Sequence, residues 1–143
     1  MQPFIRSLMT AIIIALASPG FAAEKQITVW KSPSCGCCTG WTTYLQRHGY
    51  QVKSIDIDDL DPIKKGLGVP ESMQSCHTAR IDGYVIEGHV PVEAIDRLLT
   101  ERPKVTGIAS PGMPQGSPGM NGPKEENVVQ SFGPGGGAVF GRY

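Results

Sequence analysis

The stretch KSPSCGCCTGW, residues 31–41, places three cysteines within four residues: Cys35, Cys37 and Cys38. The preceding QITVW segment alternates apolar and polar side chains, which predicts a β-strand. The residues that follow place large side chains at helical spacing as far as Gly49, a natural helix terminator. The thiols therefore lie between a strand and a helix. Two thiols suffice for a redox dithiol. The third thiol therefore indicates that this turn binds another species in addition to, or instead of, forming a disulfide.

Outward from this turn, the chain continues to alternate between strand and helix patterns. Asp61 and Pro62 suit the N-cap and first position of a short helix, and Asp82-Gly83 suits a type I′ turn between two strands. The order β-α-β-α-β-β-α is that of the thioredoxin-like fold, so we predict an α/β domain of this class. The segments are a strand at 26–30, a helix within 38–49, a strand at 51–57, a helix at about 61–65, two strands within 77–89 and a helix within 91–103.

The composition changes after residue 106. Residues 107–143 hold 10 Gly and 5 Pro among 37 residues, which is typical of loops and turns. Within them, ENVVQSF and AVFGRY flank a Gly-rich stretch at 133–137, which predicts a late β-hairpin. We therefore expect a thioredoxin-like metal-binding domain at 24–106 and a Gly/Pro-rich extension at 107–143 that packs on it.

The first 23 residues have the pattern of a secretory signal peptide. Arg6 supplies the basic start, Leu8 to Ala17 the apolar core, and small residues up to Ala23 a cleavage site. A membrane anchor is the alternative, but a span needs roughly 20 apolar residues and this run is about half as long. The short, Arg-led form is typical of bacteria, so we expect export to the periplasm.

The charge argues against some classes of partner. The sequence has 13 basic and 13 acidic residues, and removal of the signal peptide takes away Arg6, leaving 12 basic against 13 acidic. Nothing resembles the basic stripe that binds phosphate backbones, or a basic amphipathic helix for a membrane surface. We therefore expect no nucleic-acid partner and, after cleavage, no membrane partner.

Cys35 and Cys38 form a C-x-x-C motif at a predicted helix start, where the helix dipole favours thiolate. Thioredoxin-like oxidoreductases usually present a cis-proline opposite this motif. This sequence has Ser75, Cys76 and His77 there instead. If the topology holds, Cys76 faces the cysteine turn, and four sulfurs from two loops form a metal-binding arrangement.

Three long motifs carry a resemblance to a known family: SPSCGCCTGW, SCHTARIDGYVIEGHVP and GIASPGMPQGSPGM. They resemble the CopG-like family of small periplasmic metal-binding proteins with a thioredoxin-like fold, linked to bacterial copper resistance. The resemblance implies copper, held by thiolates as a multi-copper cluster, with Cu(I)/Cu(II) redox activity and other periplasmic copper-handling proteins as partners. Carried over by position, the ligands are Cys35, Cys37, Cys38 and Cys76.

Copper also agrees with the chemistry of the remaining candidate ligands. Zinc, the lesser alternative, accepts four thiolates, whereas Cu(I) favours thiolate and thioether together. Met113 and Met120 lie in a repeated Pro-Gly-Met setting within a loop, where thioethers stay accessible. His77 and Met113 are therefore further candidate ligands. His89 and Met120 are open to either a ligand or a structural interpretation, and His48 is expected to be structural.

Three alternatives to a copper centre stay open. The first is an enzyme, a periplasmic thiol-disulfide oxidoreductase with Cys35 as attacking and Cys38 as resolving thiol. The second is a pair of structural disulfides, for which four cysteines allow three connectivities. The clustering argues against it, because bridges stabilise most when they close long loops. The third is a zinc-binding module with no redox role.

Overall fold

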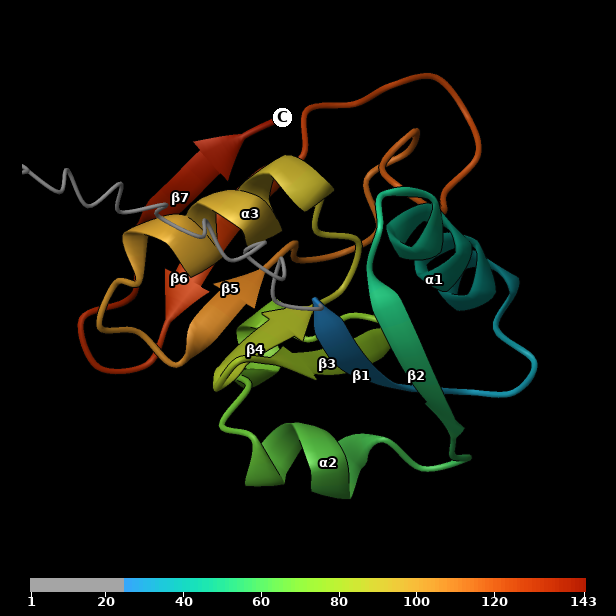
Figure 1. Cartoon of the computed structure of the whole chain (residues 1–143), viewed down its shortest axis with the longest axis horizontal. Helices are drawn as coiled ribbons and strands as arrows, with labels where there is room; N and C mark the ends of the chain where they lie inside the picture. The colour runs from blue at the N-terminus through green and yellow to red at the C-terminus, as the bar shows by residue number, and fades with distance from the viewer. Residues whose placement is uncertain (1–24) are drawn as a thin grey trace, which may run out of the picture.

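The computed structural model describes residues 25–143, so the predicted signal peptide lies outside the described residues. A seven-stranded mixed sheet, in the order β2-β1-β3-β4-β5-β6-β7, forms the centre of the molecule (Figure 1). The mixed α/β class is the one predicted. The elements are β1 (Gln26–Lys31), α1 (Gly36–Arg47), β2 (Gln51–Asp56), α2 (Asp61–Gly66), the 3-10 turn η1 (Glu71–Met73), β3 (His77–Ile81), β4 (Tyr84–Glu87), α3 (Val92–Glu101), β5 (Gly107–Ala109), β6 (Val128–Phe132) and β7 (Val139–Arg142).

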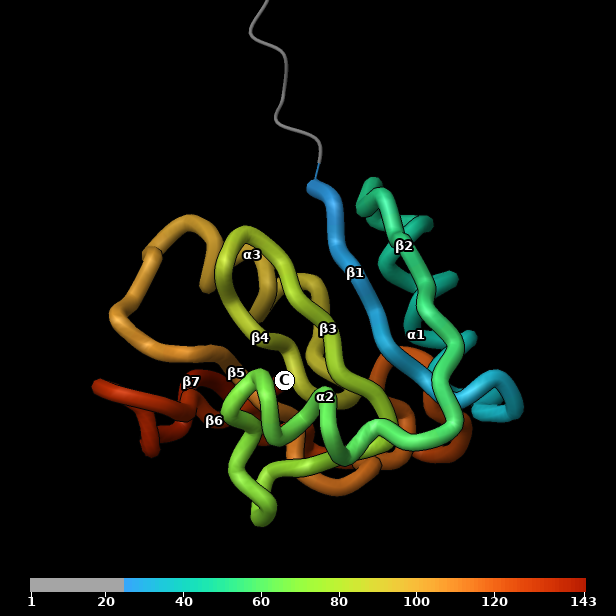
Figure 2. Tube along the Cα trace, turned by 90° about the horizontal axis from the view of Figure 1, so that it is seen from below, coloured from blue at the N-terminus to red at the C-terminus, as the bar shows by residue number. Residues whose placement is uncertain are grey.

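The sheet combines parallel and antiparallel pairs. β1 runs parallel to β2 and antiparallel to β3, and the β3–β4 hairpin is followed by a parallel β4–β5 pair. Helices α1 and α3 cover one face of the sheet, whereas α2 lies on the opposite face (Figures 1 and 2). The order from β1 to α3 is the order that the sequence predicts.

The core lies between the sheet and the α1–α3 layer. Alternate residues of β1, Ile27 and Val29, are buried, as expected for a strand with one packed face. From α1, Trp41 and Leu45 pack into the same cluster. The indole Nε1 of Trp41 donates to the Val90 carbonyl at 2.9 Å, so its one polar atom is satisfied in the core.

Two of the three predicted helix starts need a correction. The thiols do not precede α1 but begin it: Cys35 is the N-cap, and Cys37 and Cys38 lie in the first turn. In α2, the N-cap is Leu60 and Asp61 is the first helical residue, so the predicted cap is wrong by one position. The reason is local: the Asp59 carboxylate accepts the Asp61 N–H at 3.0 Å, and Leu60, the N-cap, makes no side-chain capping bond.

The C-terminal residues extend the sheet. The predicted hairpin is present as the antiparallel pair β6–β7. Strand β5 was not predicted, because three residues that are all buried show no periodicity. Between β5 and β6, the segment 110–127 runs past the start of α1 (Figure 1). There a Cβ on Gly119 would meet the Trp41 nitrogen at 2.5 Å, so only glycine allows this approach.

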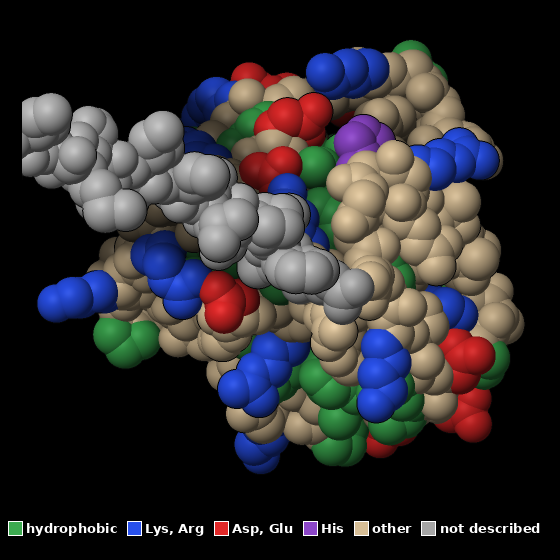
Figure 3. All heavy atoms as spheres, viewed as in Figure 1, with side chains coloured by type: hydrophobic (Ala, Val, Ile, Leu, Met, Phe, Trp, Pro, Cys, Tyr) green, Lys and Arg blue, Asp and Glu red, His purple; other side chains and the backbone are tan. Residues whose placement is uncertain are grey.

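The face of the molecule drawn in Figure 3 is mixed in charge. On the face in Figure 3, outside the area under grey atoms, basic and acidic side chains are interspersed. No helix among residues 25–143 has the length and apolar character needed to cross a membrane.

Candidate metal centre

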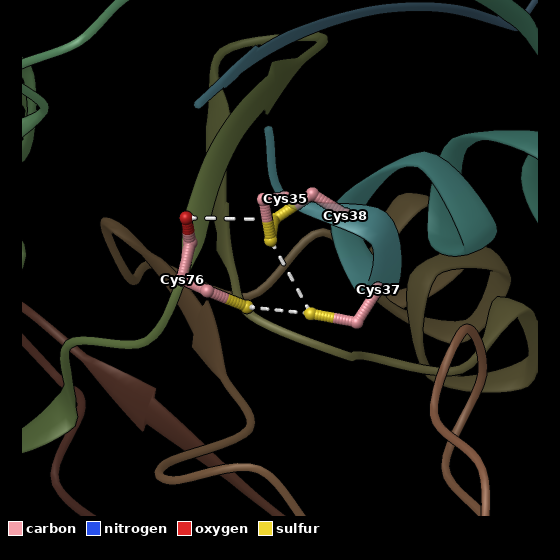
Figure 4. A group of neighbouring side chains, drawn as sticks. All are labelled: Cys35, Cys37, Cys38 and Cys76. Carbon is pink, nitrogen blue, oxygen red and sulfur yellow. Dashed lines mark hydrogen bonds between the residues drawn. A yellow bond between two sulfur atoms is a disulfide. The ribbon is translucent and has the colours of Figure 1, made fainter. Parts of the chain in front are cut away.

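Four cysteine sulfurs meet at the start of α1 (Figure 4). The Sγ atoms of Cys35, Cys37, Cys38 and Cys76 all lie within 4.8 Å of one another. Cys37 Sγ is 3.3 Å from Cys35 Sγ and 3.7 Å from Cys76 Sγ. The Sγ of Cys38 lies 3.6 Å from the backbone oxygen of Cys76. The convergence expected from the sequence is therefore present in the fold.

The pairing of β1 with β3 brings these sulfurs together. The two strands are antiparallel, and Lys31, the last residue of β1, is opposite His77, the first residue of β3. The cysteine turn leaves the sheet where Cys76 enters it. Sulfurs that are 39 positions apart in sequence thus share one end of the sheet.

Cys35 and Cys38 are joined in a disulfide, while Cys37 and Cys76 are free thiols. The alternative of two structural disulfides therefore does not hold, because all four cysteines are among the described residues. Cys38 is fully buried, whereas Cys35 is partly exposed. A four-thiolate centre needs this disulfide in its reduced form, since bonded sulfurs are not thiolates.

Two buried histidines extend the group of possible ligands. Cys76, His77 and His89 form a second set whose candidate ligand atoms lie within 4.8 Å of one another. Cys76 Sγ is 3.0 Å from His89 Nε2 and 3.6 Å from His77 Nδ1. Both rings are fully buried and meet edge to face, with centroids 4.8 Å apart. Cys76 thus belongs to both sets.

The hydrogen bonds of His89 fix its tautomer. Its Nδ1 lies 2.8 Å from the Pro118 carbonyl, which can only accept, so Nδ1 carries the proton. Its Nε2 is therefore unprotonated, and its lone pair faces Cys76. A ligating histidine in a metal site commonly donates its other N–H to a carbonyl in this way. His89 is therefore oriented as a ligand.

Burial keeps both imidazoles neutral. Burial lowers the pKa of His77, and the nearby His89 and Lys64 lower it further. Burial also lowers the pKa of His89, although the bond to Pro118 opposes this. The neutral ring is the form that binds metal. In addition, His77 Nε2 is a buried nitrogen with no hydrogen-bond partner among the described residues.

The Cys76 thiol is protonated when no metal is bound. Burial, followed by the neighbouring Cys37, raises the pKa of Cys76 to about 11. The thiol can then donate its proton to the Nε2 lone pair of His89. A metal that binds Cys76 must displace this proton.

Comparison with known proteins places this chain in a family. Two solved structures, "Copper resistance protein copG", Form 2 and Form 1, are each 40% identical to this chain. Each alignment covers 84% of this chain and 98% of the other, with TM-scores of 0.79 and 0.78. This chain belongs to the CopG family. The family profile described as "Protein of unknown function, DUF411" matches residues 73–120, and no curated protein matches the sequence.

The profile match includes one side of the site in this CopG-family chain. It spans Cys76, His77, His89 and the Pro-Gly-Met loop, but not the cysteine turn. Met113 is 56% exposed, and its neighbour Gly112 accepts a hydrogen bond from Ser75 Oγ at 2.7 Å. Met113 therefore lies in a segment anchored beside the site, with its side chain largely in solvent.

Other candidates from the sequence have structural partners. Met120 is partly buried, and its N–H donates to the Ser117 carbonyl within the loop. His48 caps the end of α1, where its Nδ1 lies 2.8 Å from the Tyr44 carbonyl. The interpretation of His48 as structural is therefore confirmed.

A local signal in the sequence places His89 beside Cys76. Asp82 and Gly83 have φ values of +48° and +87°, as the predicted type I′ turn requires. A two-residue turn fixes the register, and Ile81 pairs with Tyr84. Continuing that register to the strand ends places Cys76 opposite His89. Counting outward from the turn therefore identifies His89 as a neighbour of Cys76 and a candidate ligand.

Proposed function

We propose that this protein binds copper through a cysteine-thiolate centre and acts in copper resistance. The observation that supports it most is the convergence of four sulfurs, with two neutral imidazoles beside them. The donor set fits the ion, because Cu(I) is soft and favours thiolate sulfur and imidazole nitrogen. The two CopG structures are described as copper resistance proteins, which favours copper over zinc.

The arrangement of the donors favours more than one copper ion. Cys35, Cys37, Cys38 and Cys76 form one set, and Cys76 with the two histidines forms another. Because Cys76 is common to both, its thiolate is placed to bridge ions. This supports a multi-copper cluster, with His77 and His89 as ligands at its buried side. Met113, exposed in the segment that Ser75 binds through Gly112, is proposed as a thioether ligand for incoming Cu(I).

The redox part of the proposal uses the same thiols. Two thiols that close a disulfide release two protons and two electrons, which reduce two Cu(II) ions to Cu(I). Such a step would convert Cys35 and Cys38 into the disulfide that joins them in the structure. Copper turnover in this way requires other proteins to supply electrons and to exchange copper.

The cellular setting completes this proposal. We place the protein in the periplasm, exported by the predicted signal peptide at residues 1–23. We also propose that residues 24–106 are a thioredoxin-like unit with 107–143 as its extension. The β2-β1-β3-β4 strand order and the parallel β1–β2 pair support this, because a β-α-β crossover followed by an antiparallel hairpin characterises such a unit.

Copper titration of the reduced protein tests the function. We expect an absorption band from thiolate-to-copper charge transfer and more than one copper per chain. Zinc titration of the same preparation is the control, and we expect copper to displace bound zinc. The absence of any copper binding by the reduced protein would overturn the proposal.

The alternative function is a thiol-disulfide oxidoreductase. The disulfide between Cys35 and Cys38 favours it, because the partly exposed Cys35 is placed for attack by a substrate thiol and the buried Cys38 for resolution. Metal-free protein would then catalyse disulfide exchange, and a Cys76→Ser variant would keep that activity. Exchange no faster than that of free dithiothreitol would reject this alternative.

A further inference from the structure

A buried ion pair lies beside Cys76, between α2 and the β3–β4 hairpin. Lys64 Nζ is 2.6 Å from Glu87 Oε1, and the two side chains are 5% and 0% exposed. Thr78 donates from Oγ1 to Glu87 Oε2 at 2.6 Å and accepts from Lys64 Nζ at 2.9 Å. Every charged atom of the pair is therefore paired inside the protein.

The same carboxylate holds the residue that precedes Cys76. Glu87 Oε1 accepts the backbone N–H of Ser75 at 2.6 Å. On its other side, Ser75 Oγ donates to the Gly112 carbonyl at 2.7 Å. The backbone of Gly88 closes the third side, since a Cβ there would lie 2.7 Å from Ser75 Cβ. Ser75 thus has little freedom, and Cys76 follows it directly.

Stability alone does not account for this pair. Removing two charges from water costs several kcal/mol per ion, and apolar replacements of buried pairs are often as stable. Lys64 is also the one buried residue of the short helix α2. Helix α2 therefore buries one charged group, the Lys64 ammonium, against the Glu87 carboxylate.

We propose that Lys64 and Glu87 are positioning residues for the metal centre. Lys64 neutralises the Glu87 carboxylate, which holds the Ser75 N–H and thereby keeps Cys76 Sγ 3.7 Å from Cys37 Sγ and 3.0 Å from His89 Nε2. The metal part of this inference rests on the proposed copper function. The positional part concerns the apo protein and is tested separately.

The test separates positioning from folding. The double variant Lys64→Met/Glu87→Leu replaces the ion pair by apolar side chains of similar size, so the fold is expected to persist. It leaves the Ser75 N–H without its acceptor. The matched control is Lys31→Met/Asp56→Leu, which removes a 2.7 Å ion pair of the same sheet that makes no hydrogen bond to Ser75 within residues 25–143. Urea unfolding of both variants verifies that they fold.

The first readout needs no metal. In a Cys35→Ser/Cys38→Ser background, only Cys37 and Cys76 remain, and diamide can join them as a disulfide. We expect the Lys64→Met/Glu87→Leu change to slow this reaction about tenfold or more, because misplacement of one reacting sulfur lowers the rate steeply, and the control to leave it within about twofold. Equal rates in the parent and the double variant would overturn the inference.

The second readout is copper affinity in the four-cysteine protein, measured by competition with a Cu(I) chelator. A loss of about 10–100-fold in the double variant and none in the control is expected. If the parent binds no copper but the cross-linking rate still falls, the copper function fails and the positioning role stands. Should the double variant not fold, Glu87→Gln is used instead. This variant keeps one acceptor oxygen, so we expect cross-linking of Cys37 to Cys76 to be severalfold slower than in the parent. Cross-linking at the same rate as in the parent would overturn the inference.

Discussion

The sulfur of Cys37, in the first turn of α1, lies 3.7 Å from the sulfur of Cys76, the residue before β3. Strand pairing, not closeness in sequence, brings the two sulfurs together. Strands β1 and β3 are antiparallel, and the end of β1 at Lys31 lies opposite the start of β3 at His77. A turn that would otherwise hold only its own three cysteines thereby gains a fourth sulfur and two histidines. The convergence of the four sulfurs therefore depends on β1 and β3 being neighbours in the sheet.

Replacement of Cys76 is expected to affect copper more than folding. Cys76 belongs to both candidate ligand sets, so Cys76→Ser removes the sulfur that joins them. We expect fewer coppers per chain and a weaker thiolate-to-copper band. Met73→Leu is the control, because it removes a sulfur that packs in a separate apolar cluster. Unchanged copper content in Cys76→Ser would contradict the shared role of Cys76.

His89 is expected to bind metal, whereas His48 is not. His89→Gln removes an unprotonated nitrogen that faces Cys76 and the bond that orients it. We expect a loss of Cu(I) affinity of about 10–100-fold, as for ligands and their partners in other metal sites. His48→Gln changes an exposed ring at the end of α1 and is expected to have no effect. Equal affinities of the two variants would argue against His89 as a ligand.

The approach of the 110–127 segment to α1 is expected to depend on Gly119. Both Gly119 and Gly112 have positive φ, at +85° and +72°, so alanine at either costs about 1–2 kcal/mol of backbone strain. A Cβ at Gly119 would also lie 2.6 Å from the Cys37 carbonyl, whereas at Gly112 it would meet nothing within 4 Å. Urea unfolding should therefore show Gly119→Ala as the less stable variant. Equal free energies of unfolding would mean that this close contact does not form.

The stability of the protein is expected to fall in acid partly through Asp96. Burial opposes ionisation of Asp96, but hydrogen bonds from Lys25 and Tyr50 outweigh it and lower its pKa below 3.8. Because the pKa of Asp96 is lower in the folded than in the unfolded protein, Asp96 stabilises the fold at pH values above its ordinary pKa. This stabilisation is lost as the pH falls through the pKa of Asp96 in the folded protein.

Asp96→Asn tests this contribution by urea unfolding at several pH values. We expect the parent to be more stable at pH 7 by about 0.2–1 kcal/mol, the scale of a half-exposed ion pair. The difference should shrink below about pH 4. A difference that stays constant down to about pH 2.5 would contradict the assignment.

Local signals in the sequence predicted local structure well. Gly49 ends α1 with a φ of +84°, and the Asp82-Gly83 turn forms as its residue types require. Both features depend on adjacent residues, so the chain specifies them without tertiary context. The first strand and helix follow from periodicity in the same way.

Features that depend on distant pairing were not predictable in this way. Lys64 lies in a polar helix, and Glu87 looks like an outward residue of a hairpin strand. Their burial follows from where α2 packs on the sheet, which no local pattern encodes. Strand β5 also could not be predicted from a local pattern, because its three residues form a strand only by pairing with β4 on one side and β6 on the other.

X-ray absorption at the copper edge of the reduced, copper-loaded protein tests the central account most directly. The convergence of Cys35, Cys37, Cys38 and Cys76 predicts sulfur as the main neighbour of copper, with a minor nitrogen contribution from imidazole. A first shell of nitrogen and oxygen alone would contradict it.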